Sequence, residues 1–214
     1  RDVVILALNK LYLMSVVISK TWLSKTWFTA DTHFSHQRTL ELSQRSFKTV
    51  AEMDWEMVKR WNEIVGDKDK VCHLGDFGDP KFLQYLQGDK IIFLPGNDDK
   101  PEIMDKLSLD KRLVIIDNNQ VITIKAGQAS EQVFRLIHEP ENGLNVNDFY
   151  LFGHIHKLQM VKKNGLNVGV DCHNFSPISS DTVLFYRNAI EHHYDNNVFM
   201  SKIEKQELER HHDL

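Results

Sequence analysis

Side chains that bind metal ions recur in this sequence at points where short apolar runs end. Two aspartates, one asparagine and four histidines share this position: Asp31, His33, Asp76, Asn97, His138, His154 and His156. Each cluster alone is more typical of a turn or a loop, so the prediction of a site depends on their joint occurrence. If the apolar runs are strands of one core, the ends of these strands present the seven side chains.

The mixture of oxygen and nitrogen donors decides which cofactor these residues would hold. Carboxylate, amide and imidazole ligands without a thiolate favour Mn, Fe, Zn, Co or Ni over Ca or Mg. Seven ligands are too many for one four-coordinate ion, and they suit two ions that share a bridging carboxylate. We therefore expect two divalent metal ions, with Mn²⁺ as the first choice.

The elements that must position these residues alternate between strands and helices in the first half of the chain. Strands are expected over residues 26–30, 71–74 and 91–94, and helices over 49–65, 80–86 and from 101 onward. In the longest helix, Thr49 is a candidate N-cap, apolar residues recur every three or four positions, and Gly66 ends the pattern. Asp31 and His33 are two residues apart, so in an extended segment their side chains would point the same way.

The second half of the chain is rich in strands. Strands are expected over residues 113–116, 121–125, 133–138 and 149–152, followed by a hairpin of 158–162 with 166–170. A last helix is expected from Ser179 or Ser180 to Tyr194. The whole pattern predicts an α/β protein with stacked sheets and helices outside them.

Length and composition indicate one ordinary globular domain over residues 1–214. The chain is 42% hydrophobic and 26% charged, with a formal net charge of -4, so no basic excess points to a nucleic-acid-binding surface. Residues 1–13 are interpreted as an extension before Met14, the expected natural start, and residues 195–214 as a C-terminal helical tail.

We predict a cytoplasmic protein with no membrane partner, because no targeting signal is recognised and the two thiols are expected to be reduced. The apolar run near the N-terminus is too short and interrupted for a membrane span, and it has no cleavage site of a signal peptide. The two cysteines, Cys72 and Cys172, lie in apolar surroundings without zinc-site spacing, which favours buried free thiols in a reducing compartment.

The order of the motifs resembles that of the calcineurin-like metallophosphoesterases. The matching segments are DTH at 31–33, GDFGD at 75–79, GNDD at 96–99, His138, and GHIH at 153–156. The segments DTHFSH, HLGDF and NVGVD are similar in particular to the small phosphoesterases of bacteria and phages. The resemblance implies a four-layer α/β/β/α sandwich of two mixed sheets flanked by helices, with metals at the strand ends.

The resemblance also implies a role for each ligand. One metal would be held by Asp31, His33 and His156, the other by Asn97, His138 and His154, with Asp76 as the bridge. The implied activity is that of a dinuclear metal-dependent phosphoric ester hydrolase, in which a metal-activated hydroxide attacks phosphorus. The expected partner is a small phosphomonoester or phosphodiester, with nucleotides among the candidates.

Asp98 stands where this family usually has a histidine that assists the leaving oxygen. We take Asp98 and Asn97 as the candidate catalytic residues. An aspartate beside two cations should stay ionised, which makes it a poor acid at neutral pH. Asp98 either acts as an acid with a raised pKa or holds a water or a substrate amine. We expect an activated aryl ester to be cleaved more readily than an alkyl phosphate.

Several neighbours of the motifs are weaker candidates. Contact with the phosphate is considered for Arg45, His36 and His73, with a structural hydrogen bond as the alternative for each. Asp79 is expected to support the site without binding metal. Asp99 is expected to orient His33 or a loop.

Two other functions remain open. A nuclease using the same site would need a basic groove, for which Lys157, Lys162 and Lys163 form the one cluster near a metal motif; nucleic acid is not the favoured partner. A binding scaffold without activity would fit Asp98 but not the complete set of seven ligands. The sequence does not choose between monoester and diester, and it favours Mn²⁺ without fixing the native metal or the oligomeric state.

Overall fold

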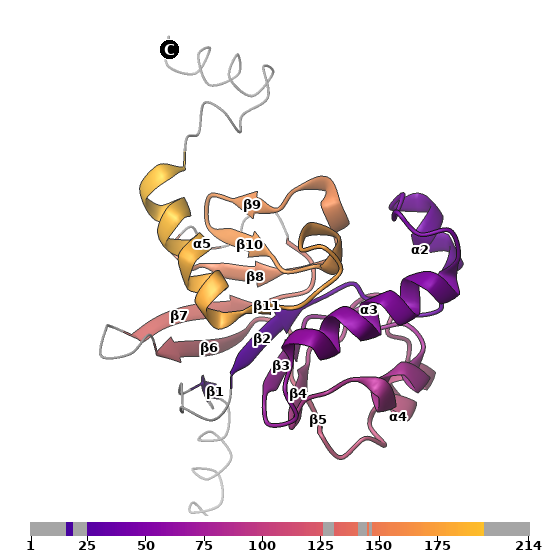
Figure 1. Cartoon of the computed structure of the whole chain (residues 1–214). Helices are drawn as coiled ribbons and strands as arrows, with labels where there is room; N and C mark the ends of the chain where they lie inside the picture. Colours follow the sequence, from indigo (N-terminus) through magenta and orange to yellow (C-terminus); the bar gives the residue numbers. More distant parts are fainter. Residues whose placement is uncertain (1–15, 19–24, 126–130, 141–144, 146, 195–214) are drawn as a thin grey trace, which may run out of the picture.

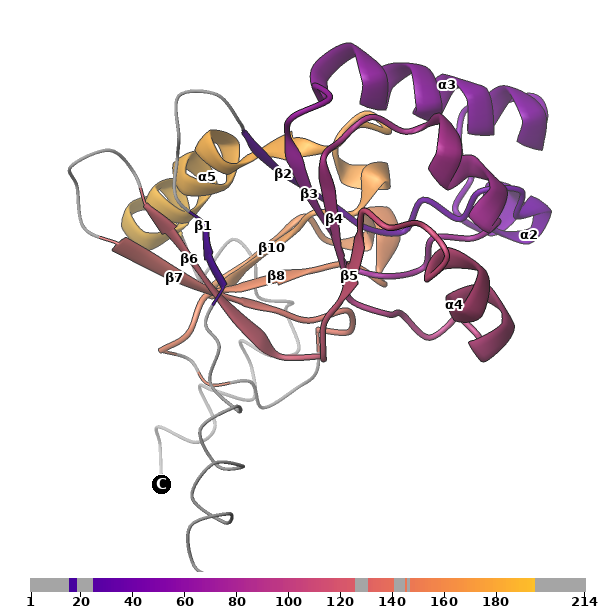
Figure 2. The ribbon, with the colours of Figure 1, turned by 90° about the horizontal axis from the view of Figure 1, so that it is seen from below.

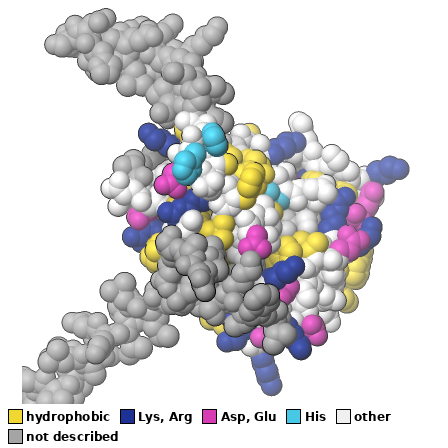
Figure 3. Space-filling view, turned by 60° about the vertical axis from the view of Figure 1, so that its left-hand side comes forward, with side chains coloured by type: hydrophobic (Ala, Val, Ile, Leu, Met, Phe, Trp, Pro, Cys, Tyr) yellow, Lys and Arg dark blue, Asp and Glu magenta, His cyan; other side chains and the backbone are white. Residues whose placement is uncertain are grey.

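The computed structural model describes residues 16–18, 25–125, 131–140, 145 and 147–194. The predicted extension (1–13) and the predicted helical tail (195–214) lie outside these residues. No helix in the described part of the chain is long and apolar enough to cross a membrane. Among the described residues visible in Figure 3, basic and acidic side chains are interspersed and form no broad basic patch on that face.

Two mixed β-sheets form the centre of the molecule (Figure 1). The five-stranded sheet has the order β11 (Ile178–Ser179), β2 (Thr26–Thr29), β3 (Lys70–His73), β4 (Lys90–Phe93) and β5 (Leu113–Ile115). The six-stranded sheet has the order β1 (Val16–Ile18), β6 (Gln120–Lys125), β7 (Glu131–Leu136), β8 (Tyr150–Phe152), β10 (Gly165–Asn167) and β9 (Val161–Lys162). Strands β2 to β5 are parallel to one another, so their carboxyl ends meet at one edge.

Helices flank the two sheets. The described α-helices are α2 (Gln37–Leu42), α3 (Val50–Ile64), α4 (Pro101–Leu107) and α5 (Ser180–His193). Short 3-10 helices span Pro80–Tyr85, His156–Leu158 and Val170–Cys172. Figure 2 shows α3 and α4 on the side of the five-stranded sheet away from β6 and β7. Helix α5 contacts β2, β10 and β11. The predicted α/β arrangement of two mixed sheets flanked by helices is therefore confirmed.

Alternation along the parallel strands explains why both faces of the five-stranded sheet are buried. One set of side chains packs beneath α3: Trp27, Val71 and Ile91. The residues that follow them in sequence face the other sheet: Phe28, Cys72 and Ile92. A parallel sheet covered on both faces needs such continuous apolar runs. Both cysteines are free thiols, as predicted, with Cys72 fully buried and Cys172 half-buried.

Helix boundaries follow local signals where those signals are strong. Thr49 caps α3 by accepting a hydrogen bond from the backbone of Glu52, and Ser179 caps α5 in the same way through Thr182. Pro101 occupies the first turn of α4. These three helices were predicted.

Other boundaries differ from the sequence prediction. Residues 80–86, expected as an ordinary short helix, form a 3-10 helix over Pro80–Tyr85. Leu158, expected in the first strand of a hairpin, lies in the 3-10 helix His156–Leu158, and β9 begins only at Val161. Helix α2 and strand β11 were not predicted. Because α2 has only six residues and no side-chain cap, it carries no helical signal of its own.

Candidate dimetal site

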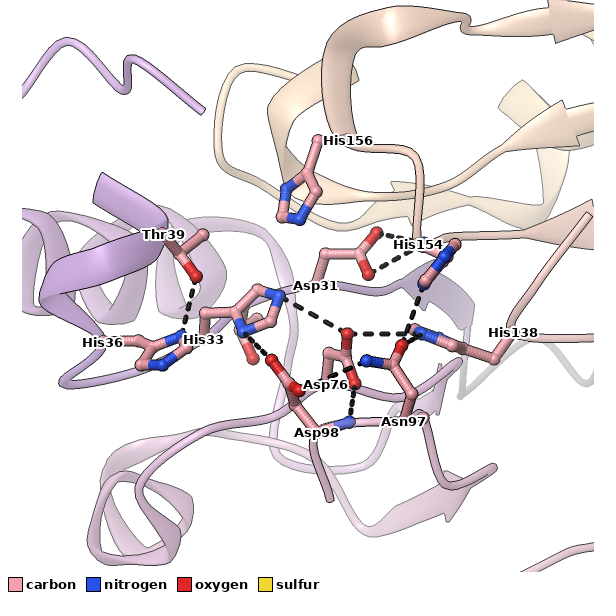
Figure 4. A network of polar contacts seen from close by, with 12 residues as sticks. Asp31, His33, His36, Thr39, Asp76, Asn97, Asp98, His138, His154 and His156 are labelled. Atoms are coloured by element: carbon pink, nitrogen blue, oxygen red, sulfur yellow. Dashed lines mark hydrogen bonds and ion pairs between the residues drawn. The ribbon is translucent and has the colours of Figure 1, made fainter. Parts of the chain in front are cut away.

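The carboxyl ends of strands from both sheets meet at the candidate site (Figure 4). The segments that follow β2, β3 and β4 contribute Asp31, Asp76 and Asn97, and those that follow β7 and β8 contribute His138 and His154. An isolated parallel bridge between Ala30 and Gly169 ties the two sheets together beside this edge. The fold therefore brings all five predicted motifs to one place.

Asp76 belongs to two separate groups of potential metal ligands. In one group, ligand atoms of Asp31, His33 and Asp76 lie within 4.8 Å of one another. In the other, those of Asp76, His138 and His154 do the same. Oδ2 of Asp76 lies 3.5 Å from Nε2 of His33 and 3.2 Å from Nε2 of His138. A carboxylate shared by two ligand groups is the arrangement that a bridging ligand requires.

Asn97 and His156 complete the set of candidate ligands. Asn97 lies beside His138 and His154, and His156 lies beside His33. Oδ1 of Asn97 lies 3.0 Å from Nε2 of His138 and 2.9 Å from Nδ1 of His154. The imidazole of His156 stacks against that of His33, with the ring centroids 5.2 Å apart. All seven residues predicted as ligands therefore lie together.

Hydrogen bonds behind two of the histidines decide which ring nitrogen faces the site. Nδ1 of His138 donates to the carbonyl of Leu74 over 2.7 Å, and Nδ1 of His156 donates to Oδ2 of Asp171 over 2.7 Å. These oxygen atoms only accept hydrogen bonds, so in the neutral ring the lone pair is on Nε2. This is the tautomer that a metal ligand needs.

Backbone strain is concentrated on the candidate ligands. Five of them have positive φ angles: Asp31 (58°), His33 (48°), Asp76 (57°), His154 (69°) and His156 (48°). Non-glycine residues adopt this conformation infrequently, and such strain tends to gather at functional sites. The assumption of an extended segment over Asp31 and His33 was therefore wrong. Their side chains converge because backbone bonds to Gly75 and Asp76 hold the turn (3.0 and 2.9 Å).

Two glycines keep space at the site, Gly169 for the Asp31 carboxylate and Gly75 for the backbone of Gly96 and the ring of His138. A Cβ on Gly169 would lie 2.5 Å from Oδ2 of Asp31. Gly75 has a φ of +91°, and a Cβ there would lie 2.5 Å from the backbone nitrogen of Gly96. Any larger residue at either position would displace the carboxylates or their loops.

The charges of the site fit divalent cations. Burial raises the pKa of Asp31 to about 6 and lowers the pKa of His33 to about 3. For His138, burial acts to lower the pKa, but the hydrogen bond and charge of Asp76 outweigh it and raise the pKa to about 9. Nε2 of His33 is buried without a hydrogen-bond partner. A neutral imidazole with an unpartnered nitrogen beside buried carboxylates is a ligand set for a divalent metal ion.

Asp98 lies on the open side of the site. Its backbone N–H donates to Oδ1 of Asp76 over 2.9 Å, and its Oδ2 is 3.8 Å from Nδ1 of His33. The Asp98 side chain is 44% exposed. It lines the cavity next to the candidate ligands.

Asp99 and Asp79 each hold a local segment, and within the described residues neither belongs to a group of potential metal ligands. Asp99 accepts hydrogen bonds from three backbone N–H groups, those of Asp76, Phe77 and Gly96. Of the two predicted roles for Asp99, the structure shows the orientation of a loop. Asp79 caps the 3-10 helix that follows it and forms an ion pair with Lys81 at 2.7 Å.

His36 is the one predicted substrate contact that reaches the cavity. Its Nδ1 lies 2.7 Å from Oγ1 of Thr39, and its ring stacks on His33 with centroids 5.3 Å apart. Contact of His36 with a phosphate stays a prediction.

Arg45 and His73 lie inside the protein and do not line the cavity. The guanidinium of Arg45 holds Asp171 with bonds of 2.9 and 2.8 Å and donates to the carbonyls of Asp31 and Thr32. His73 is fully buried, with Nε2 3.0 Å from Oγ1 of Thr32. This placement matches the alternative role considered for both residues, a structural hydrogen bond.

Two residues of the site were missed. Asp171 follows the buried run 168–170, and its position at the end of an apolar run was the signal that the other motifs carry. Arg38 lines the cavity from α2, and no pattern in the sequence marks it because α2 itself was not predicted.

Comparison with known proteins identifies the family. Residues 26–171 match the model of the calcineurin-like phosphoesterase superfamily domain, which is more than half of the chain, so the protein belongs to this superfamily. The chain is 29% identical over 177 residues to the uncharacterized protein MJ1445 of Methanocaldococcus jannaschii, covering 75% of this chain and 89% of that protein. It is 34% identical over 93 residues to the gene 66 protein of Mycobacterium phage L5, covering 39% of this chain and 44% of that protein.

A solved structure supports the fold. The crystal structure of AQ665 from Aquifex aeolicus, a protein of unknown function, has a TM-score of 0.58 and 21% identity. The similarity covers 76% of this chain and 99% of that chain. At this identity the likeness extends to the fold alone.

Proposed function

We propose that this protein hydrolyses a small phosphate ester, such as a nucleotide, with two divalent metal ions, of which Mn²⁺ is the first choice. The observation that carries the proposal is the shared position of Asp76 between two ligand groups. Asp31, His33 and His156 would hold one ion, and Asn97, His138 and His154 the other.

The net charge of the loaded site supports a phosphate substrate. Two divalent ions bring four positive charges, and Asp31 and Asp76 bring two negative ones. Asp98 at the rim adds a third carboxylate. The net charge of the loaded pocket is still positive, so the pocket attracts an anion although the chain is acidic overall. When bound, the ions supply a nucleophilic water at neutral pH and stabilise charge on the phosphoryl oxygens.

The residues of the chain determine how the reacting groups are held. His138 and His156 are held in one tautomer by Leu74 and Asp171, so they offer Nε2 to the ions. Asp98 borders the path of the leaving group, and when its carboxylate is ionised it has no proton to donate. The protein therefore favours esters whose leaving group needs no protonation.

The test is turnover with and without metal. Nucleoside monophosphates, cyclic nucleotides and bis-p-nitrophenyl phosphate are assayed with added Mn²⁺ and again after chelation. Turnover is expected only with metal, and Asp76→Asn should lose both ions, counted by elemental analysis, together with the activity. The exposed Asp67 serves for a matched control, Asp67→Asn, which should keep both ions.

Absence of turnover with two ions bound would contradict the proposal. It would favour the second candidate, a binding scaffold, for which Asp98 in place of the usual histidine is the specific observation. Loss of only one ion in Asp76→Asn would contradict the bridging role.

A further inference from the structure

Two cavities meet beside the metal ligands. One has a volume of about 440 Å³ and the other about 550 Å³. Both are lined by the same four residues, His33, His36, Arg38 and Asp98, so they are neighbours that share this wall, which is called the junction here. Figure 4 shows His36 and Asp98 on either side of His33 at this junction. A substrate phosphate at the ligands therefore has open space in two directions.

The walls of the two cavities differ in chemistry. The first cavity, the leucine arm, is lined by Leu42 of α2 and by Leu158 of the 3-10 helix His156–Leu158. These side chains are 70% and 85% exposed, respectively, which leaves apolar surface free for a ligand. The second cavity, the lysine arm, is lined by Lys100 and Lys106. Lys157 also lines the leucine arm, and Asp79, which is paired with Lys81, also lines the lysine arm. The arms therefore differ by the two exposed leucines of one and the two lysines of the other.

Arg38 is placed to neutralise a phosphate at the junction. It is exposed, it lines both arms, and none of the described residues forms an ion pair with it. A free guanidinium at the mouth of a phosphate site can bind two oxygens at once. It also offsets the negative charge that Asp98 brings to the same point.

The number of arms indicates whether the cleft suits a phosphomonoester or a phosphodiester. A phosphomonoester has one organic substituent and needs one arm. A phosphodiester has two substituents, and both must leave the metal ligands in different directions. Hydrolysis adds water across one P–O bond and yields an alcohol and a phosphomonoester. In an in-line displacement, the alcohol departs opposite the attacking water, so one substituent needs an open path of its own.

We propose that the cleft binds a phosphodiester whose alcohol, such as a nucleoside, packs the apolar face of its base in the leucine arm and whose other substituent carries a second phosphate that lies in the lysine arm. Arg38 contacts the scissile phosphate at the junction. This inference rests on the proposed function and names its substrate class.

The experiment compares three substrates, each of which adds one group to the one before. They are thymidine 3′-phosphate, the dinucleotide TpT, and pTpT, which has an added 5′-phosphate, so the leaving group is a nucleoside in all three. Products are separated so that cleavage of the internal diester is counted apart from loss of the terminal phosphate. The diesters should have the higher kcat/KM, and pTpT should have a KM lower than that of TpT by about tenfold, as expected of a charge-assisted contact.

A pair of double variants tests the lysine arm. Lys100→Ala with Lys106→Ala should raise the KM of pTpT by about tenfold more than the KM of TpT and so remove the advantage of pTpT. The matched control, Lys59→Ala with Lys111→Ala, removes the same charge from residues that line neither arm, and it should keep the advantage. Higher kcat/KM for the monoester than for both diesters would overturn the inference. An equal rise in KM for TpT and pTpT in the first variant would do so too.

Binding is measured alongside turnover, so that the two proposals fail separately. If neither these three esters nor the wider panel of phosphate esters is cleaved with two ions bound, the proposed function is wrong. The dissociation constants of TpT and pTpT, measured with the same variants, still test the lysine arm. Equal affinity for the two dinucleotides would overturn the inference, and tighter binding of pTpT that depends on Lys100 and Lys106 would support it.

Discussion

Nδ1 of His156 donates a hydrogen bond to Oδ2 of Asp171 over 2.7 Å, and the same carboxylate is held by Arg45. Arg45 is separated from Asp171 by 126 positions in the chain. The orientation of one candidate metal ligand therefore depends on an ion pair formed only after long-range folding. A carboxylate behind a ligating histidine sets both its tautomer and its ring angle.

Asp171→Asn should weaken the binding of one metal ion. The amide is a poorer acceptor for His156, and changes of this kind typically cost about 10- to 100-fold in metal affinity. Titration with Mn²⁺ should show one weakened site and one unchanged site. Asp148 also pairs with an arginine, Arg135 at 2.6 Å, and Asp148→Asn is the matched control away from the ligands. Equal weakening of both sites would contradict the positioning role.

Arg45→Met should destabilise the fold. Removing the guanidinium leaves the buried Asp171 carboxylate without its partner, which costs about 3–5 kcal/mol of unfolding free energy. Urea unfolding of the metal-free protein measures this loss. Arg60 pairs with Glu56 on the surface of α3 and donates to Asn174, and Arg60→Met should lower the unfolding free energy by much less than Arg45→Met because these groups are solvated. A raised KM with unchanged stability would show instead that Arg45 binds the phosphate.

Asp98→His should speed the cleavage of esters that have poor leaving groups. A proton donor at this position is typically worth roughly 10² to 10⁴ in rate, and an alkyl ester needs it more than an aryl ester. The ratio of alkyl to aryl turnover should therefore rise, and it should be low in the unchanged protein. Equal turnover of the two esters before the substitution, with chemistry rate-limiting, would show that Asp98 does not limit the reaction.

Metal affinity should rise with pH. In the metal-free site, Asp76 raises the pKa of His138 to about 9, and burial raises the pKa of Asp31 to about 6. Both groups must lose their protons to bind metal. Between pH 6 and 9 the apparent affinity should gain about tenfold per pH unit for the His138 proton, with a steeper slope below pH 6. Mn²⁺ titrations at pH 5.5, 7 and 8 measure the slope, and a flat profile would contradict it.

Much of the fold was predictable because its signals are local. The apolar rhythm of α3, the cap at Thr49 and the proline that starts α4 each act within a few residues. Short elements without such signals were missed. Helix α2 and strand β11 form because their neighbours hold them: β11 pairs with β2, and α2 contacts α3.

The sequence by itself predicted seven candidate metal ligands and their order along the chain, because each cluster follows an apolar run and the clusters occur together. Only the tertiary structure decided how they are held. Left-handed turns aim Asp31 and His33, contrary to the extended segment expected. The Asp171–Arg45 pair, the burial of His73 and the junction at Arg38 depend on contacts between residues distant in the chain, and sequence spacing carries no information about such contacts.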